Sequence, residues 1–179
     1  MKKYIAFLRG VNVSGQKKLP MAQLREVLSK SGLSDVGTYI QSGNIFFSYQ
    51  EVEKEEIEKL IRKTILTEFG FEVPVLVQLK TDIEDVVQNN PFLDSQDKAR
   101  LYYVLLKEAP SEELKKAFEQ EVFENENFHI TNECVYLSCN AGYGKAKLNN
   151  NLIERKLKVE ATTRNHKTML KMNELAGEL

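Results

Sequence analysis

The sequence contains few of the residues that hold metals or form cross-links. Its 179 residues include two cysteines, two histidines and no tryptophan. Cys134 and Cys139 are five positions apart on one expected strand, so they point to opposite faces and cannot form a disulfide with each other. Two histidines and no Cys-x-x-Cys pair leave too few ligands for a structural zinc site. We therefore expect no metal, no redox role and no cofactor.

Long hydrophobic runs are also missing. The longest apolar runs, residues 102–106 and 5–8, are much shorter than the roughly 20 residues that cross a bilayer. The first residues lead directly into an expected strand and do not resemble a signal peptide. With 42% hydrophobic and 28% charged residues, the chain can bury a core without disulfides. We expect a soluble cytoplasmic protein that does not contact membranes.

The net charge of −1 conceals a separation of charge along the chain. Residues 1–30 carry a net charge of +6, residues 31–144 carry −11, residues 145–171 carry +6 and residues 172–179 carry −2. If the two basic segments meet in space, they form a positive patch on an otherwise acidic protein. The alternative is that their lysines only form solvated surfaces.

The first eighty residues show the pattern β-α-β-β-α-β. Strands are expected at residues 3–9, 36–41, 45–48 and 73–79, with the last at an edge because of Pro74. Helical spacing follows Pro20 and ends near Gly32, and a second amphipathic helix ends near Gly70. Ser48 and Glu51 fit a capping box for that second helix. This order is typical of the split βαβ unit of ferredoxin-like folds.

The same order then repeats. Thr81 and Glu84 are expected to cap a short helix, followed by a connector. Strands are expected at residues 101–107, 128–131, 135–139 and 159–162, and helices at residues 111–121, 148–157 and 168–176, with Asn149 or Asn150 near the start of the second. We therefore predict an α+β fold of two ferredoxin-like halves, with antiparallel sheets and helices packed on one face. The predicted domains are residues 1–80, a helix and connector at 81–98, and residues 99–179 with an extra C-terminal helix.

In a ferredoxin-like half the loop after the first strand and the hairpin after the second emerge at the same end of the sheet. Because the first and third strands pair, Arg9 should lie close to Asn44. This topology gathers hydrogen-bond donors and positive charge on one rim, for which the candidates are Arg9, Asn12, Ser14, Lys17, Lys18, Ser42 and Asn44. The loop nearly matches a phosphate-binding P-loop, but Gln16 replaces the essential lysine, which argues against an ATPase or GTPase. The alternative is a glycine-rich turn that only connects strand to helix.

A second candidate region runs from residue 145 to residue 167. Asn165 can cap the closing helix, which leaves Arg164, His166 and Lys167 beside unpaired amides at its start. Basic residues at the positive end of a helix are unfavourable unless an anion offsets them, so we expect a phosphate or carboxylate site with Lys145 and Lys147 nearby. The alternative is that Arg164 pairs with a carboxylate of the acidic middle of the chain.

Three segments together resemble a bacterial family of unknown function, number 1697. They are residues 8–15 (LRGVNVSG), residues 38–47 (TYIQSGNIFF) and residues 161–171 (ATTRNHKTMLK). The resemblance covers nearly the whole chain and implies two small ferredoxin-like units with no established activity. The matching motif positions are Arg9, Gly10, Asn12, Gly15, Ser42, Gly43, Asn44, Lys147, Arg164 and Asn165. The chain departs from the family at His166, where an aromatic residue is frequent, and at Ser14, where glycine is common.

Three hypotheses about function follow. The first is a binding protein whose basic rim between the two halves holds an anionic ligand such as a nucleotide, a phosphorylated metabolite or RNA. The second is a small enzyme in the same pocket, in which Arg9 and Arg164 orient an anionic substrate and Lys147 or His166 handles protons. The third is a protein–protein interaction module in which the motifs only stabilise the fold. The sequence leaves the oligomeric state open.

Overall fold

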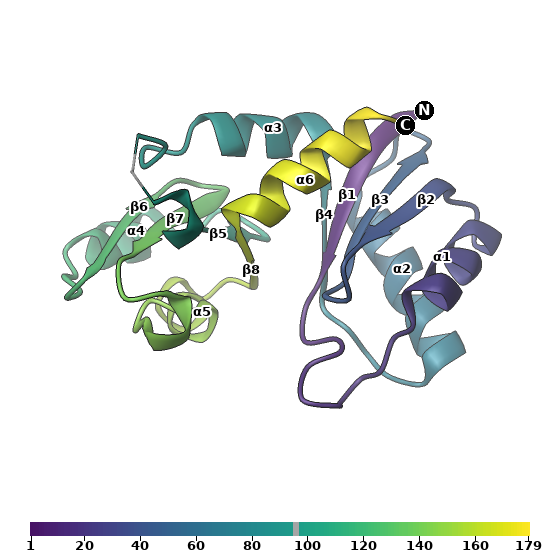
Figure 1. Ribbon diagram of the computed structural model, residues 1–179, viewed down its shortest axis with the longest axis horizontal. Coiled ribbons are helices and arrows are strands. Elements are labelled where there is room, and N and C mark those ends of the chain that lie inside the picture. Colours follow the sequence, from purple (N-terminus) through teal and green to yellow (C-terminus); the bar gives the residue numbers. More distant parts are fainter. Residues whose placement is uncertain (95–96) are drawn as a thin grey trace. The chain divides into compact units, whose positions relative to one another are not determined.

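The computed structural model describes residues 1–94 and 97–179 (Figure 1). These residues form two compact units. Unit 1 consists of Met1–Glu84 and Lys171–Leu179, and unit 2 consists of Asp85–Leu170. Each unit has its own four-stranded antiparallel sheet. The connector expected at residues 81–98 includes residues 95 and 96, which lie outside the described part of the chain.

Unit 1 has the expected element order. Its elements are β1 (Lys2–Leu8), α1 (Met21–Lys30), β2 (Ser34–Tyr39), β3 (Asn44–Tyr49), α2 (Lys54–Phe69) and β4 (Val75–Leu79). The strands lie in the order β2-β3-β1-β4, with β1 antiparallel to both β3 and β4. This is the split βαβ topology, and β4, which follows Pro74, is an edge strand as predicted.

The core of unit 1 forms where the sheet packs against α1 and α2. Alternate residues of a strand point to one face, and residues four apart lie on one side of a helix. The sequence has both spacings, and the resulting core includes Tyr4, Ala6 and Leu8 of β1, Leu24 and Leu28 of α1, and Ile57, Ile61 and Ile65 of α2. Each of these side chains is at most 1% exposed. The helices therefore cover one face of this sheet.

The capping box predicted at Ser48 and Glu51 is wrong. Ser48 lies within β3, opposite Lys3 of β1, so it belongs to the sheet. The helix α2 begins at Lys54, and Glu53 takes the N-cap position without a side-chain hydrogen bond. The spacing of a capping box was present, but strand pairing continues past the serine and uses its backbone.

Unit 2 repeats this order. The helix α3 (Lys80–Gln88) and the short turn η1 (Lys98–Arg100) precede β5 (Leu101–Leu106). Then come α4 (Glu112–Glu119), β6 (Glu126–Ile130), β7 (Cys134–Cys139), the short turn η2 (Tyr143–Lys145), α5 (Asn150–Leu157), β8 (Ala161–Asn165) and α6 (His166–Gly177). The strand order β6-β7-β5-β8 matches that of unit 1. The predicted fold of two ferredoxin-like halves is confirmed.

Two boundaries in this region differ from the predictions. Thr81 lies inside α3 and does not precede it, so the predicted cap at this residue is wrong. The last strand was expected at residues 159–162 but runs from Ala161 to Asn165, because its polar second half pairs with β5 and continues the ladder. An edge strand of polar residues lacks the apolar alternation that marks a strand in sequence.

The core of unit 2 joins one face of its sheet to α4 and α5. It includes Val104, Phe118, Leu137 and Ile153. Cys139 belongs to this core, while Cys134 lies five residues earlier in β7, and both are buried free thiols. Burial raises the pKa of the Cys139 thiol to about 11, and that of the Cys134 thiol well above its usual value. Neither thiol is therefore reactive at neutral pH.

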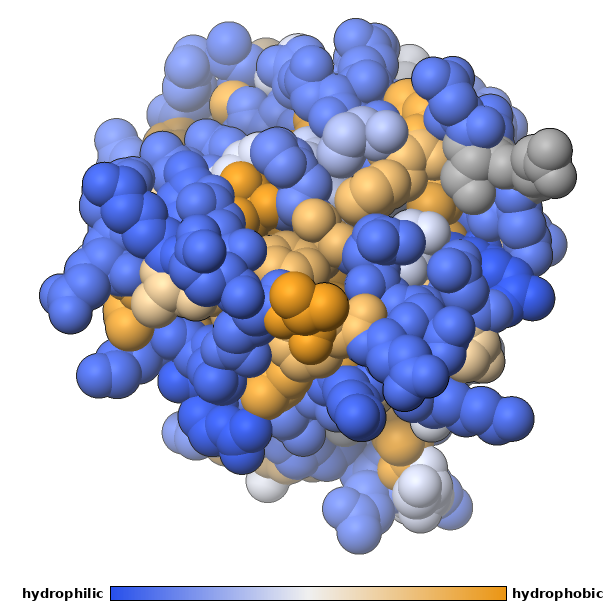
Figure 2. Space-filling model, turned by 90° about the vertical axis from the view of Figure 1, so that its left-hand side faces the viewer, coloured by the Kyte–Doolittle hydropathy of each residue, from blue (hydrophilic) through white to orange (hydrophobic). Residues whose placement is uncertain are grey.

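The surface of unit 2 is mostly hydrophilic around α4 and β6. Figure 2 shows this end of the molecule, where hydrophobic side chains gather in the middle of a hydrophilic surround. Within the described residues, no helix is long and apolar enough to span a membrane, and no group of three metal-ligating side chains is present.

Both the backbone angle and the surroundings of residue 43 require glycine at this position. Its φ is +75°, and an added Cβ would lie 2.6 Å from Cβ of Leu8 and 2.9 Å from Cγ2 of Val11.

Gly10 has a φ of +71° but open space around its Cα, which makes it a matched control. We expect Gly10→Ala to cost about 1 kcal/mol from its left-handed backbone, and Gly43→Ala to cost roughly 1–3 kcal/mol more from overpacking. Urea unfolding measures both, and equal losses would contradict the packing argument.

Candidate anion-binding site

The first candidate group lies at one end of the sheet in unit 1, as the topology predicted. Phe7 of β1 is paired with Asn44 of β3, and the amide of Leu8 donates to the carbonyl of Gly43 at 2.8 Å. The loop after β1 and the connection between β2 and β3 are therefore neighbours. Figure 1 shows both at the lower end of β1 and β3.

Asn12 holds this loop in place. Its Nδ2 donates to the carbonyls of Leu19 at 3.0 Å and Gln41 at 2.7 Å, and its Oδ1 accepts from the amide of Leu19 at 2.8 Å. All three bonds go to backbone groups, two of them across the loop and one to the β2–β3 connection. Its φ of +55° is in the left-handed region, which asparagine tolerates better than most residues. The side chain of Asn12 acts as a clamp between two loops.

Lys17, Asn44 and Arg9 also have partners within unit 1. Lys17 Nζ donates to the carbonyl of Glu72 at 2.7 Å. Asn44 is fully buried, and its Nδ2 donates to the carbonyl of Tyr39 at 3.1 Å and to Oγ of Ser42 at 2.9 Å. The backbone amide of Arg9 donates to the carbonyl of Pro74 at 3.1 Å. These contacts explain a structural role for the group, while ligand binding by it stays a prediction.

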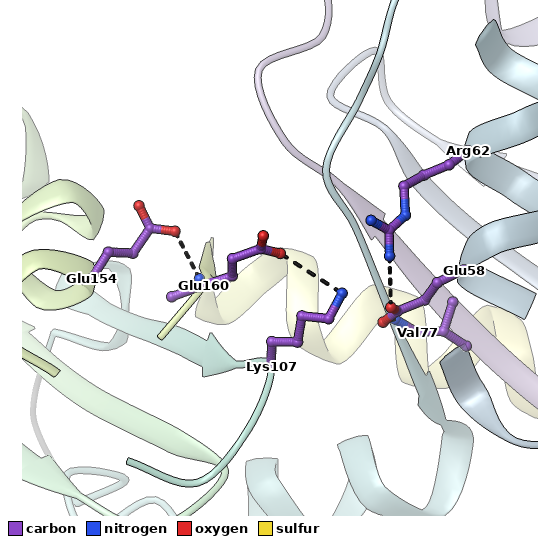
Figure 3. Close-up of polar contacts among 7 residues, drawn as sticks. Glu58, Arg62, Val77, Lys107, Glu154 and Glu160 are labelled. Carbon is purple, nitrogen blue, oxygen red and sulfur yellow. Dashed lines mark hydrogen bonds and ion pairs between the residues drawn. The ribbon is translucent and has the colours of Figure 1, made fainter. Parts of the chain in front are cut away.

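Carboxylates in both units bind backbone amides in the same way. Buried Glu58 accepts from the amide of Val77 at 3.1 Å through Oε1 and from Arg62 Nη2 at 3.2 Å through Oε2 (Figure 3). In unit 2, Glu154 Oε1 accepts from the amide of Ala161 at 2.8 Å, which joins α5 to the start of β8. Such bonds satisfy backbone donors at places where the sheet ladder does not.

Near Lys147 an anion position is filled by the chain itself. The two carboxylate oxygens of Glu126 each accept at 2.7 Å, one from the amide of Lys147 and the other from the amide of Leu148. A carboxylate held by two successive amides is the arrangement expected of an anion site just before a helix. The phosphate or carboxylate expected near Lys145 and Lys147 therefore has an internal counterpart in Glu126.

The segment after Lys147 is anchored on one face of β8. Asn149 caps α5, since its Oδ1 accepts from the amide of Leu152 at 3.0 Å. Thr163 Oγ1 donates to Oδ1 of Asn150 at 2.9 Å and accepts from the hydroxyl of Tyr143 at 3.2 Å. Neighbouring residues of a strand point to opposite faces, so Arg164 points away from this network. Thr163 and Arg164 thus lie on opposite faces of the sheet.

The junction between β8 and α6 contains Arg164, Asn165 and His166. Asn165 Oδ1 accepts from the amide of Thr168 at 2.8 Å, which confirms the predicted cap. Arg164 is partly buried in the edge strand and its Nη1 donates to the carbonyl of Thr163 at 2.9 Å. Burial lowers the pKa of Arg164 to about 10, so it remains a cation at neutral pH.

Opposite Arg164 lies a buried tyrosine that the sequence analysis did not select for the site. Tyr103 of β5 is the register partner of Arg164, so both side chains stand on the same face of the sheet. The Tyr103 hydroxyl and Nδ1 of His166 are 2.8 Å apart, and the two rings stack with centroids 5.8 Å apart. Tyr103 is fully buried and His166 is 7% exposed.

Asn90 completes the cluster. It is 4% exposed, and its Oδ1 accepts from the amide of Phe92 at 2.9 Å. Its Nδ2 is buried and has no hydrogen-bond partner in the described part of the chain. Arg62 Nε and Asn173 Oδ1 share this condition, but neither of those residues is itself fully buried. We call Asn90, Tyr103, Arg164 and His166 the β5–β8 cluster.

The pKa values of the β5–β8 cluster set the protonation states of its members at neutral pH. Burial raises the pKa of Tyr103 to about 12, and the side chain of Asn90 acts in the opposite direction, which places its amide beside the phenol. Burial, followed by the charge of Lys98, lowers the pKa of His166 below 6.5. At neutral pH the cluster therefore combines one cation, a protonated phenol, a neutral imidazole and the side-chain amide of Asn90.

Comparison with known proteins identifies the family. A model of the family described as "Protein of unknown function (DUF1697)" matches residues 1–136. The chain belongs to this family. A solved structure, described as that of conserved bacterial protein SP0830 from Streptococcus pneumoniae, is similar over 98% of this chain and 98% of that chain. Its sequence identity is 25% and its TM-score is 0.78. A search among curated proteins finds no match.

The match to the DUF1697 model covers Met1–Glu84 of unit 1 and reaches Tyr136, within β7, in unit 2. Asn12 and Asn44 lie inside it, whereas Arg164 and His166 of the β5–β8 cluster lie beyond it. The family resemblance inferred from the sequence is confirmed.

Replacing Asn12 with aspartate tests its role as a clamp. In Asn12→Asp, one carboxylate oxygen still accepts from the amide of Leu19. The other oxygen replaces Nδ2, so the carbonyls of Leu19 and Gln41 lose their donor. We expect a loss of roughly 1–3 kcal/mol in the free energy of unfolding, measured with urea. Asn127→Asp, at an exposed position of β6, is the control and should change little. An Asn12→Asp protein as stable as the wild type would contradict the structural role.

The buried imidazole of His166 predicts a dependence of stability on pH. Because its pKa in the folded protein lies below its ordinary value of 6.5, the unfolded chain binds more protons as the pH falls through that value. Stability should therefore decrease on acidification below pH 6.5. His166→Gln should flatten this slope, and His129→Gln, at an exposed position, should not. Urea unfolding at several pH values measures the slopes, and equal slopes in all three proteins would disprove the assignment.

Proposed function

We propose that the protein binds a small anionic ligand, bearing a phosphate or carboxylate group, at the β5–β8 cluster. The observation that carries this proposal is the buried amide of Asn90, whose Nδ2 lies beside the Tyr103 phenol and forms no close hydrogen bond in the described part of the chain. A buried donor without an acceptor costs about 1–3 kcal/mol. An acceptor on a ligand removes that cost.

The charge of the cluster favours an anion. Arg164 supplies a guanidinium with several donors, and Lys98 is close enough for its charge to act on His166. The cluster also stands at the start of α6, whose dipole is positive at this end. Arg164 is partly buried and lies in an edge strand of the sheet of unit 2.

The burial of the cluster favours a small ligand over RNA. Tyr103, Asn90 and His166 are each at most 7% exposed, so they suit one inserted acidic group and not an extended phosphate backbone. Binding of a single phosphate should weaken gently as salt increases, whereas contacts with many phosphates would weaken steeply. The candidate ligands are therefore phosphorylated metabolites, nucleotides or small carboxylic acids.

A thermal-shift screen tests this proposal. Inorganic phosphate, nucleotides, sugar phosphates, small carboxylic acids and a short RNA are added at two salt concentrations. A ligand at about 100 times its dissociation constant adds roughly 2.7 kcal/mol, which moves the melting temperature by several degrees. We expect a small anion to give this shift in the wild type and a much smaller shift in Arg164→Ala.

Arg155→Ala is the matched control, because Arg155 is exposed on α5 of the same unit and its loss changes the net charge equally. It should retain the full shift. The proposal is wrong if no small anion stabilises the wild type, or if both variants respond like the wild type. A shift given by RNA alone, with steep salt dependence, would also contradict it.

A further inference from the structure

Val122 is 94% exposed, which is the largest value among the exposed large hydrophobic residues of the described chain. It lies in the segment between α4 and β6 and precedes Phe123. A single exposed valine needs no explanation, but a patch of neighbouring apolar side chains does. Ala117, which is exposed on α4, and the partly buried Phe123 and Phe128 extend the apolar surface on either side.

Three phenylalanines form the base of this surface. The ring centroids of Phe118 and Phe128 are 4.8 Å apart, those of Phe123 and Phe128 6.0 Å, and those of Phe118 and Phe123 6.4 Å. Phe118 is buried in the core, so it fixes the two partly exposed rings from below. We call the exposed Ala117 and Val122, together with the partly buried Phe123 and Phe128, the Val122 patch.

Acidic residues flank Val122 along the chain. Residues 119–126 contain four glutamates and no lysine or arginine. Glu121 is paired with Lys156, and Glu126 binds two backbone amides. Glu119 and Glu124 are exposed and have no ion pair in the described part of the chain. The unpaired negative charge thus lies beside the apolar area, and Figure 2 shows hydrophobic side chains enclosed by hydrophilic ones on this end of the molecule.

Strand β6 can pair with another chain through its backbone, because it is an edge strand. Strand β6 is the first in the order β6-β7-β5-β8, so it pairs with β7 on one side only. An edge strand can accept a further strand from another chain, with hydrogen bonds between the backbones and specificity from alternate side chains. Phe128 lies on β6, so a segment added here would place every second side chain near the patch.

We propose that the Val122 patch and the edge of β6 bind an extended segment of a partner protein in which basic and apolar residues alternate. The apolar residues of that segment would cover Val122 and Phe128, and its lysines or arginines would face Glu119 and Glu124. An acidic lipid surface or a second copy of the same patch is disfavoured as the partner, because its negative charges would face those of Glu119 and Glu124. This inference is independent of the β5–β8 cluster.

The probe is a peptide of alternating lysine and valine. A peptide of alternating glutamate and valine, which carries the opposite charge, is the control. We expect the lysine peptide to bind with a dissociation constant that rises about tenfold in the double variant Val122→Ser/Glu124→Gln, measured by fluorescence anisotropy. Both positions are exposed, so the variant should fold normally. Leu66→Ser/Glu68→Gln, a pair of exposed positions on α2 of unit 1, is the control and should leave binding unchanged.

Three results would overturn the proposal. They are equal binding of the lysine peptide by the patch variant, equal binding of the glutamate peptide by the wild type, and self-association in sedimentation equilibrium that Val122→Ser abolishes. The last result would make a second copy the occupant. Arg164→Ala should leave peptide binding unchanged, which separates this test from that of anion binding.

Discussion

Backbone groups that leave the sheet ladder must find hydrogen-bond partners, and in this protein side chains supply many of them. Asn12 bonds three backbone groups of two loops, and Glu126 bonds two successive amides before α5. Glu58 and Glu154 each accept from a strand amide. These bonds fix loops and strand edges in both units.

This constraint changes the meaning of the polar motifs. Asparagines and lysines in glycine-rich loops suggest a ligand, yet Asn12, Lys17 and Asn44 all bond groups of their own unit. The β5–β8 cluster differs, since one of its buried donors has no partner within the described residues. Among the three residues with such an atom in the described part of the chain, Asn90 is the one whose side chain is buried as a whole. For that reason we propose Asn90 and Arg164 as the ligand site.

The fold followed from the sequence because hydrophobic spacing changes clearly between strands and helices. The caps Asn149 and Asn165 were also predictable, since asparagine before a helical pattern has a specific physical role. The cap at Ser48 failed because local spacing competes with strand pairing. Arg164 and His166 were selected from charge at a helix start, but Tyr103 was not, because a tyrosine in an apolar strand has the pattern of a core residue. Its place beside Arg164 depends on the register of β5 with β8, which no local pattern contains.

The most direct test of the anion site follows the side-chain amide of Asn90 by NMR during a titration with inorganic phosphate. If Nδ2 is the donor that the ligand satisfies, its proton signals should move downfield and exchange more slowly with water. The amide signals of Asn12 and Asn44, which are already hydrogen-bonded, should stay in place. Unchanged signals of Asn90 at phosphate concentrations that stabilise the protein would show that the ligand binds elsewhere.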